Sequence, residues 1–281
     1  MATLPLERDV ARPPHIAVAR DILFRFHRGD SVDGTLLRHL LEQETGVSDS
    51  SGAWSMRQAY DALELAQTLF AADEHCPLLA GSPLQALEAL EAFVERLPVQ
   101  SYRSEQQVEL QQFSTPLTLA YVAGLAAQPR AGETMLEPSA GNGLLAWPAA
   151  RAGSRMFLNE LDAERRESLA EAFPGASLSG HDAELIDDLL CPAGRPSLVL
   201  MNPPFGRSAG RGVDRYAGAR HLEAALSRLV PGGRLVAIMP ASFGEAGSGR
   251  ELRARIDRRA CLRLDLLLAP GAFARHGTGV S

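Results

Sequence analysis

A short apolar run, residues 198–201, leads directly into an Asn-Pro-Pro-Phe sequence that begins at Asn202. No other stretch restricts the fold as strongly, because an apolar run stopped by prolines is typical of a buried strand that ends there. The two prolines fix their own φ angles and keep Asn202 out of the helical region. The Asn202 amide and the carbonyl of Pro203 are therefore predicted to lie side by side at a strand end.

Two neighbouring acceptors of this kind predict a site for a planar group that carries an amino function. The acceptors can hold both N–H bonds, and the ring of Phe205 can stack on the planar face. Alternatively, the sequence forms only a proline-rich turn after a core strand. The preceding segments of the chain favour the binding site.

A strand, a loop of small residues and the start of an apolar helix are predicted between residues 134 and 145. Glu137 ends the strand, and Gly141 and Gly143 allow the loop backbone to approach a ligand closely. A Gly-x-Gly pair alone is a weak indication. A third glycine at dinucleotide spacing is missing, which argues against a nicotinamide cofactor.

Acidic residues follow two more predicted strands. Glu160 comes after the segment 155–159 and can accept hydrogen bonds from ribose hydroxyls. Asp182 comes after the next strand, and its carboxylate can face an adenine amino group. Either acid alone could instead be a helix cap or a solvated loop residue. In this order, ahead of the Asn-Pro-Pro-Phe sequence, they indicate one ligand site along one edge of a sheet.

The ordered segments resemble the adenine-N6 DNA methyltransferases, which use S-adenosylmethionine (SAM). The resemblance is carried by residues 113–116, 136–143, 159–162, 182 and 202–205, and it covers about residues 108–280. It is closest to the gamma-type order, in which the cofactor motifs precede the catalytic one. The chain is also similar to the methylase-like region of phage and mobile-element proteins that carry a strawberry-notch-type helicase. Asn142 departs from the family's usual short residue, and we expect altered loop contacts there rather than loss of binding.

The resemblance implies an α/β fold of the class I SAM-methyltransferase type. Its mostly parallel, doubly wound sheet follows an all-α N-terminal domain and lacks the last antiparallel strand. The implied activity is methyl transfer from SAM to the N6 amino group of adenine in DNA. The implied cofactor-binding residues are Thr115, Glu137, Pro138, Ser139, Ala140, Gly141, Asn142, Gly143, Glu160 and Asp182. The implied catalytic residues are Asn202, Pro203, Pro204 and Phe205.

The roles of these residues follow from the same resemblance. We expect Glu137 to contact the α-ammonium group of SAM and Thr115 its carboxylate. Glu160 is expected to contact the ribose and Asp182 the adenine. A target adenine must be flipped out of a duplex or already unpaired. Asn202 and the Pro203 carbonyl then accept from its amino group while Phe205 stacks on the base. Positioning of the two reactants supplies the rate gain, and no metal is needed.

All 28 basic residues are arginine, and they are unevenly distributed. Residues 207–281 hold 13 arginines against six acidic residues, whereas residues 1–206 hold 15 against 28. This positive third begins directly after the predicted catalytic residues, where a polyanion would lie. We therefore expect a nucleic-acid partner, with DNA favoured over RNA. Arg207, Arg211 and Arg215 are expected to contact its phosphates. The arginines between residues 250 and 259 are expected on a solvated helix face.

The first hundred residues predict helices over 16–26, 34–44, 55–71 and 82–96, with caps at or near their starts from Ser31, Ser55 and Ser82. Residues 1–110 carry nine arginines against 17 acidic residues, so this region is a poor DNA-binding surface. We divide the chain into a helical domain, 1–100, and a methyltransferase domain, 101–281, with a linker over 97–108. No catalytic residue is expected in the helical domain.

The C-terminal part predicts a helix over 221–229 and strands over 232–240 and 262–268. The chain ends at Ser281, before the last antiparallel strand that the resemblance implies. We therefore expect a truncated methyltransferase module. A helicase or another partner chain would then supply that strand, the DNA specificity or both.

Composition adds few limits. No apolar run reaches the roughly 20 residues of a membrane span, and the N-terminus lacks the apolar core of a signal peptide. Three distant cysteines, Cys76, Cys191 and Cys261, favour reduced thiols in a cytoplasmic protein without a zinc site.

Three other functions fit part of this pattern. An RNA adenine methyltransferase differs only in its substrate. A protein-glutamine methyltransferase would hold an amide on the same Asn-Pro-Pro platform, but it needs no basic surface. The third is a catalytically silent SAM-binding or scaffolding module of a larger DNA-processing or defence complex, which the missing strand favours.

Overall fold

The computed structural model describes residues 12–99, 114–190, 195–204, 207–208, 212–213, 217–240, 243 and 248–268 of the 281-residue chain. The helices are α1 (Pro14–Arg28), α2 (Gly34–Thr45), α3 (Met56–Ala72), α4 (Pro83–Glu95), α6 (Leu117–Ala127), α7 (Trp147–Arg151), α8 (Ala163–Ala172), α9 (Ile186–Leu189), α10 (Ala217–Arg228) and α11 (Ser248–Asp257). Short 3-10 turns are η1 (Asp49–Ser51), η2 (Pro77–Leu79) and η3 (Ala183–Leu185). The strands are β1 (Thr134–Glu137), β2 (Arg155–Asn159), β3 (Ser177–Ser179), β4 (Leu198–Met201), β5 (Arg207–Ser208), β6 (Gly212–Val213) and β7 (Arg234–Ala237).

The five-stranded sheet has the order β3-β2-β1-β4-β7, and each neighbouring pair is parallel. The chain moves outward in one direction from β1 to β3 and returns to the other side of β1 with β4. Ligands of such sheets bind outside the carboxyl ends of the strands, at the point where the order reverses. This point lies between β1 and β4.

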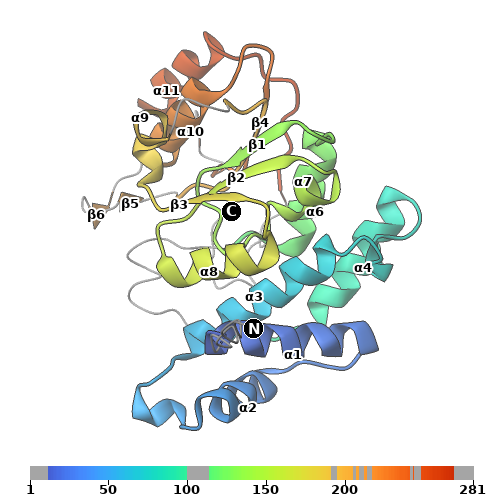
Figure 1. Ribbon diagram of the computed structural model, residues 1–281. Coiled ribbons are helices and arrows are strands. Elements are labelled where there is room, and N and C mark those ends of the chain that lie inside the picture. The colour runs from blue at the N-terminus through green and yellow to red at the C-terminus, as the bar shows by residue number, and fades with distance from the viewer. Residues whose placement is uncertain are drawn as a thin grey trace, which may run out of the picture.

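Alternate residues of the central strands belong to two cores, one on each face of the sheet. Met135, Leu198 and Leu200 belong to one core, while Leu136 and Val199 belong to the other. A strand period of two explains this division. Figure 1 shows α6, α7 and α8 on one side of the sheet, and α9, α10 and α11 on the other. The predicted parallel, doubly wound α/β fold is therefore confirmed.

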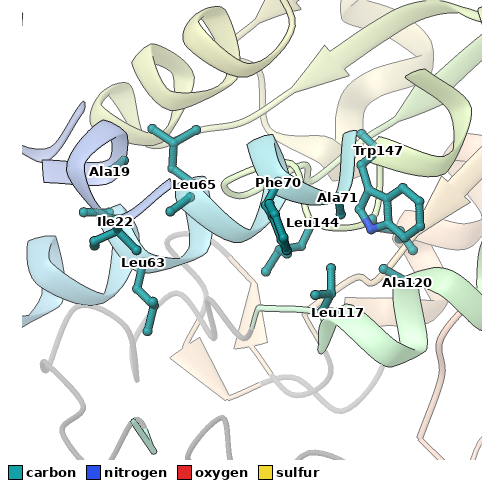
Figure 2. Close-up of a cluster of buried hydrophobic side chains, with 14 of the residues drawn as sticks. Ala19, Ile22, Leu63, Leu65, Phe70, Ala71, Leu117, Ala120, Leu144 and Trp147 are labelled. Carbon is teal, nitrogen blue, oxygen red and sulfur yellow. The ribbon is translucent and has the colours of Figure 1, made fainter. Parts of the chain in front are cut away.

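The N-terminal helices share a core with the first of these faces. α3 is buried along most of its length, and Leu65 and Phe70 lie between α1 and the glycine-containing segment after β1 (Figure 2). The same cluster includes Leu117 of α6, Leu144 and Trp147. One continuous apolar core therefore connects α1 and α3 to the sheet. The division of the chain at residue 100 stays a prediction.

The predicted N-terminal helices form within one or two residues of their expected ends. Two predicted caps are present as capping boxes. The side chains of Ser55 and Ser82 accept from the backbone N–H groups of Gln58 and Gln85, and the backbone N–H groups of the two serines donate to the Oε1 atoms of these glutamines. The cap predicted near Ser31 is wrong. Asp33 caps α2 instead, and its Oδ1 accepts from the Leu36 N–H at 2.8 Å.

The strand predicted over residues 262–268 is wrong. These residues are irregular, and the side chains of Leu262, Leu264 and Leu266 are each 55% exposed. An alternating apolar pattern forms a strand only where a neighbouring strand receives its backbone groups, and β7 pairs only with β4 among the described residues. β7 is also shorter than predicted, and α10 begins at Ala217, four residues earlier than expected.

Candidate functional site at the carboxyl edge of the sheet

The glycine loop, residues 138–143, follows β1 at the reversal point of the sheet. Gly141 and Gly143 have φ values of +54° and +85°, which explains why glycine occupies both positions. The Ala140 N–H donates to the carbonyl of Asn159 at 2.9 Å and the Gly143 N–H to the carbonyl of Ala140 at 2.8 Å. The predicted helix after the loop is present but starts later than expected, since α7 begins at Trp147.

Glu160 joins the glycine loop to the end of β2. Its Oε2 accepts from the Gly141 N–H at 2.8 Å, and its Oε1 accepts from the Asp162 N–H at 2.9 Å. Only 6% of the residue is exposed. The carboxylate therefore fixes the loop beside the strand, and its predicted contact with a ribose stays a prediction.

Asn159 is a site residue that the sequence alone did not identify. Its Nδ2 donates to the carbonyls of Pro138 and His181, and its Oδ1 accepts from the Ser179 hydroxyl and the His181 N–H. These four hydrogen bonds span 2.8 to 2.9 Å and connect the ends of β1, β2 and β3. The available signal was an asparagine at the end of a buried strand, directly before Glu160.

Glu137 is the most deeply buried acid at the ligand edge, with 1% of its surface exposed. Within the described part of the chain, its Oε2 accepts no hydrogen bond. Burial, together with the nearby charge of Glu160, raises the pKa of this carboxyl well above its ordinary value. An acid in this state favours a cationic partner that donates hydrogen bonds.

Asn202 follows the fully buried strand β4, as predicted. Its Nδ2 donates to Thr115 Oγ1 at 3.1 Å, so the amide nitrogen is held on the side of α6. A Cβ added at Gly218, in the first turn of α10, would lie 3.3 Å from the Pro204 carbonyl oxygen and 3.6 Å from Pro203 Cγ. The start of α10 therefore packs tightly against both prolines.

Several other predicted site residues are placed by the same elements. Pro138 and Ala140 are buried, and Ser139 is half-buried. Asp182 is half-buried and caps η3, since its Oδ1 accepts from the Glu184 N–H at 3.0 Å. Its contact with a cofactor adenine stays a prediction.

Phe205, Arg211 and Arg215 lie outside the described residues, and of Arg207 only the backbone, in β5, is described. Other basic residues of the C-terminal third make contacts within the chain. Arg220 pairs with Glu184, and Arg255 of α11 pairs with Glu223 of α10 at 2.7 Å.

The N-terminal helices contribute to the site, which the sequence did not predict. Asn142 of the glycine loop is 2% exposed, and its side-chain amide lies against Asp61 and Glu64 of α3. Both carboxylates are buried within this contact. Among the described residues, no cluster of histidine, cysteine or acidic side chains could hold a metal ion, and no helix is long and apolar enough to cross a membrane.

No known protein family and no curated protein sequence matches this chain. Solved structures that resemble it include TrmN from Thermus thermophilus, with 22% identity, a TM-score of 0.39, and coverage of 56% of this chain and 55% of that one. A candidate RNA methyltransferase from Pyrococcus horikoshii has 22% identity, a TM-score of 0.43, and coverage of 61% and 79%. The modification subunit of a candidate type I restriction enzyme from Vibrio vulnificus has 12% identity, a TM-score of 0.41, and coverage of 72% and 46%. The chain thus spans about half the length of the first and third of these proteins, and similarity at this level carries no argument about its activity.

Proposed function

We propose that this chain is a SAM-dependent methyltransferase that acts on the N6 amino group of adenine in DNA. The observation that carries the proposal is the position of Asn202 and Pro203 at the carboxyl end of β4, across the reversal point from Glu137 and the glycine loop. Amino-group acceptors and an acid suited to a cationic ligand are thereby brought to one edge of the sheet.

The residues present suit SAM, which supplies an electrophilic methyl group on a positively charged sulfur. The buried Glu137 oxygen without a hydrogen bond would accept from the α-ammonium group of SAM. Gly141 and Gly143 leave room for the backbone to approach the ligand. Thr115 would hold its carboxylate, Glu160 its ribose and Asp182 its adenine.

Asn202 would orient the amino group of the target base. Because its Nδ2 is held by Thr115, its Oδ1 is directed away from that contact and can accept an N–H of the substrate. The carbonyl of Pro203 would accept the second N–H, so that the nitrogen lone pair faces the reactive methyl. SAM would supply the methyl group and leave as S-adenosylhomocysteine, while Asn202 and the Pro203 carbonyl would hold the amino nitrogen toward it. The proton that the methylated nitrogen loses would pass to water.

Alignment of the two reactants would account for most of the rate gain, because no side chain at this edge is required as a general base. Phe205 would stack on the flipped or unpaired base. Arg207, Arg211 and Arg215 would contact the flanking phosphates. These contacts position a nucleic acid without reading its sequence.

Two measurements test the proposal. Calorimetric titration with SAM tests cofactor binding, and Glu160→Ala should weaken it by roughly 2–4 kcal/mol, as expected for loss of charge-assisted hydrogen bonds. Transfer of tritiated methyl to duplex DNA, single-stranded DNA, RNA and protein identifies the substrate. Unchanged SAM affinity in Glu160→Ala would overturn the cofactor site. Methyl transfer only to RNA or protein would overturn the DNA substrate, and binding without transfer to any of them would indicate a silent module.

A further inference from the structure

α3 of the N-terminal region holds Asn142 of the glycine loop both by its side chain and by its backbone. The Nδ2 of Asn142 donates to Asp61 Oδ1 and Glu64 Oε2, both at 2.7 Å. The backbone carbonyl of Asn142 accepts from the Thr68 hydroxyl at 2.9 Å. Three residues on successive turns of one helix therefore fix both the side chain and the backbone of Asn142.

The same helix reaches the other side of the proposed cofactor site. The Glu64 carboxylate also accepts a hydrogen bond from the side chain of Ser114. Ser114 precedes Thr115, whose hydroxyl oxygen accepts from Asn202. A single buried acid of α3 is thus connected to the glycine loop and to the segment that meets the catalytic asparagine.

Packing leaves the glycine loop no space to shift toward the helices. A Cβ on Gly143 would lie 3.2 Å from Thr68 Cγ2, 3.2 Å from Leu169 Cδ2 and 2.6 Å from Phe173 Cε2. The loop is therefore in close contact with α3 on one side and with α8 and the residue that follows it on the other. This contact is independent of the hydrogen bonds of Asn142.

Two buried arginines pair with acids of this contact. Arg165 of α8 is 3% exposed, and its Nη2 lies 2.9 Å from Asp61 Oδ1. Arg57 of α3 pairs with Asp162, the residue that caps α8. Arg57 Nε also lies 3.3 Å from Asp61 Oδ2, so Asp61 is paired with both arginines. The cluster therefore fixes the position of α3 relative to the loop.

We propose that Asp61 and Glu64 are positioning residues of the cofactor site. They hold Asn142 so that the glycine loop keeps the conformation that receives SAM, which makes α3 part of the site. The identity of the ligand rests on the proposed function. Because these acids act through the loop, they should affect SAM and S-adenosylhomocysteine alike, although the latter lacks the sulfonium charge.

The test is a donor–acceptor exchange, measured by calorimetric titration of the full chain with both ligands. Asn142→Asp places a third carboxylate between Asp61 and Glu64, and we expect roughly tenfold or greater loss of affinity for each ligand. Combining it with Glu64→Gln restores a donor–acceptor pair between positions 142 and 64 and the parent's net charge. A carboxylate at position 142 still faces Asp61, so the affinity should return in part. In the control Gln67→Leu, affinity should stay unchanged. The Gln67 side chain is buried on α3, and among the described residues it donates only to the Leu63 carbonyl of the same helix.

A readout without ligand separates this inference from the proposed function. Amide hydrogen exchange over residues 140–146 should be faster in Asn142→Asp than in the parent chain, and it should slow again in the double variant. The positioning role is overturned if Asn142→Asp keeps the exchange rates and ligand affinities of the parent chain. It is also overturned if a folded double variant recovers neither property, or if Asn142→Asp loses affinity for SAM but not for S-adenosylhomocysteine. If the parent chain binds neither ligand, the proposed function fails, and exchange alone then decides the positioning role.

Discussion

Glu137→Gln should change stability and ligand binding in opposite directions. The Glu137 carboxyl is 1% exposed, its Oε2 accepts no hydrogen bond from the described residues, and burial and Glu160 raise its pKa. Ionising it in the folded chain therefore costs free energy. Glutamine keeps the shape and removes the charge, so the variant should be more stable than the parent by about 1–3 kcal/mol near pH 8, the desolvation penalty of one unsatisfied polar group.

The pH dependence of this gain has a definite sign. Because the folded-state pKa of Glu137 is raised, the protonated acid contributes stability that is fully present below the usual glutamic-acid pKa. That contribution is lost as the pH rises through the raised value. The advantage of Glu137→Gln should therefore be small at about pH 4.5 and grow toward neutral pH, as measured by urea unfolding of both proteins across this range.

SAM binding should respond in the other direction. Glutamine offers no negative charge to the α-ammonium group, and loss of one charge-assisted hydrogen bond weakens affinity roughly tenfold to a hundredfold. Glu133→Gln is the matched control, because Glu133 precedes β1 but pairs with Arg234 at 2.8 Å, away from the ligand edge. It should lower stability and leave affinity unchanged. If Glu137→Gln destabilised the chain near pH 8 and bound SAM normally, Glu137 would be a structural acid and the reasoning would be refuted.

Three further predictions concern the substrate side of the site. Asn202→Ala should retain SAM affinity within about threefold and lose methyl transfer by at least about a hundredfold, because its contact with the amino group matters mainly in the transition state; equal transfer rates would remove it from the mechanism. Phe205→Ala should weaken binding of an unpaired adenine by roughly 1–3 kcal/mol in fluorescence titrations, and an unchanged constant would contradict stacking. Replacing Arg207, Arg211 and Arg215 by glutamine should lower the slope of log affinity against log salt by about one for each phosphate that is no longer neutralised, equally for unrelated DNA sequences. A slope that stays the same, or sharp discrimination between sequences by the parent chain, would argue against phosphate binding there.

The central strands were predictable because burial on both faces requires continuous apolar residues. β4 has this pattern throughout, whereas β1 has it only at Met135 and Leu136, between Thr134 and Glu137. Both strands form close to where they were predicted. The helices before residue 100 were equally clear, since Ser55 and Ser82 mark helix starts. The glycines after β1 were predicted to allow close approach of the backbone to a ligand, which stays a prediction. The structure adds that Gly141 and Gly143 both have positive φ.

Contacts between distant segments were not predictable from local patterns. Asp61 and Glu64 lie on an amphipathic helix, where acidic residues ordinarily face water, yet both are buried against a loop about 80 residues later in the sequence. Asn142 was recognised as a departure from the family pattern, but its partners were not. The strand prediction for residues 262–268 was wrong for the converse reason. The alternation of apolar and polar residues was clear, but no strand lies beside this segment among the described residues.

The buried polar groups of the site divide according to whether the chain itself satisfies them. Both oxygens of Glu160 and the side-chain nitrogen of Asn142 are bound by other parts of the chain, so they shape the loop whether or not a ligand is present. Glu137 has no such partner at Oε2 among the described residues, so its cost in free energy is offset only when a ligand donates to it. Ligand binding should therefore relieve this cost. Stabilisation by a given ligand concentration should rise with pH as Glu137 ionises, as long as the α-ammonium group of the ligand keeps its proton. Because α1, α3 and the sheet share one core, that stabilisation should extend to the N-terminal helices as well.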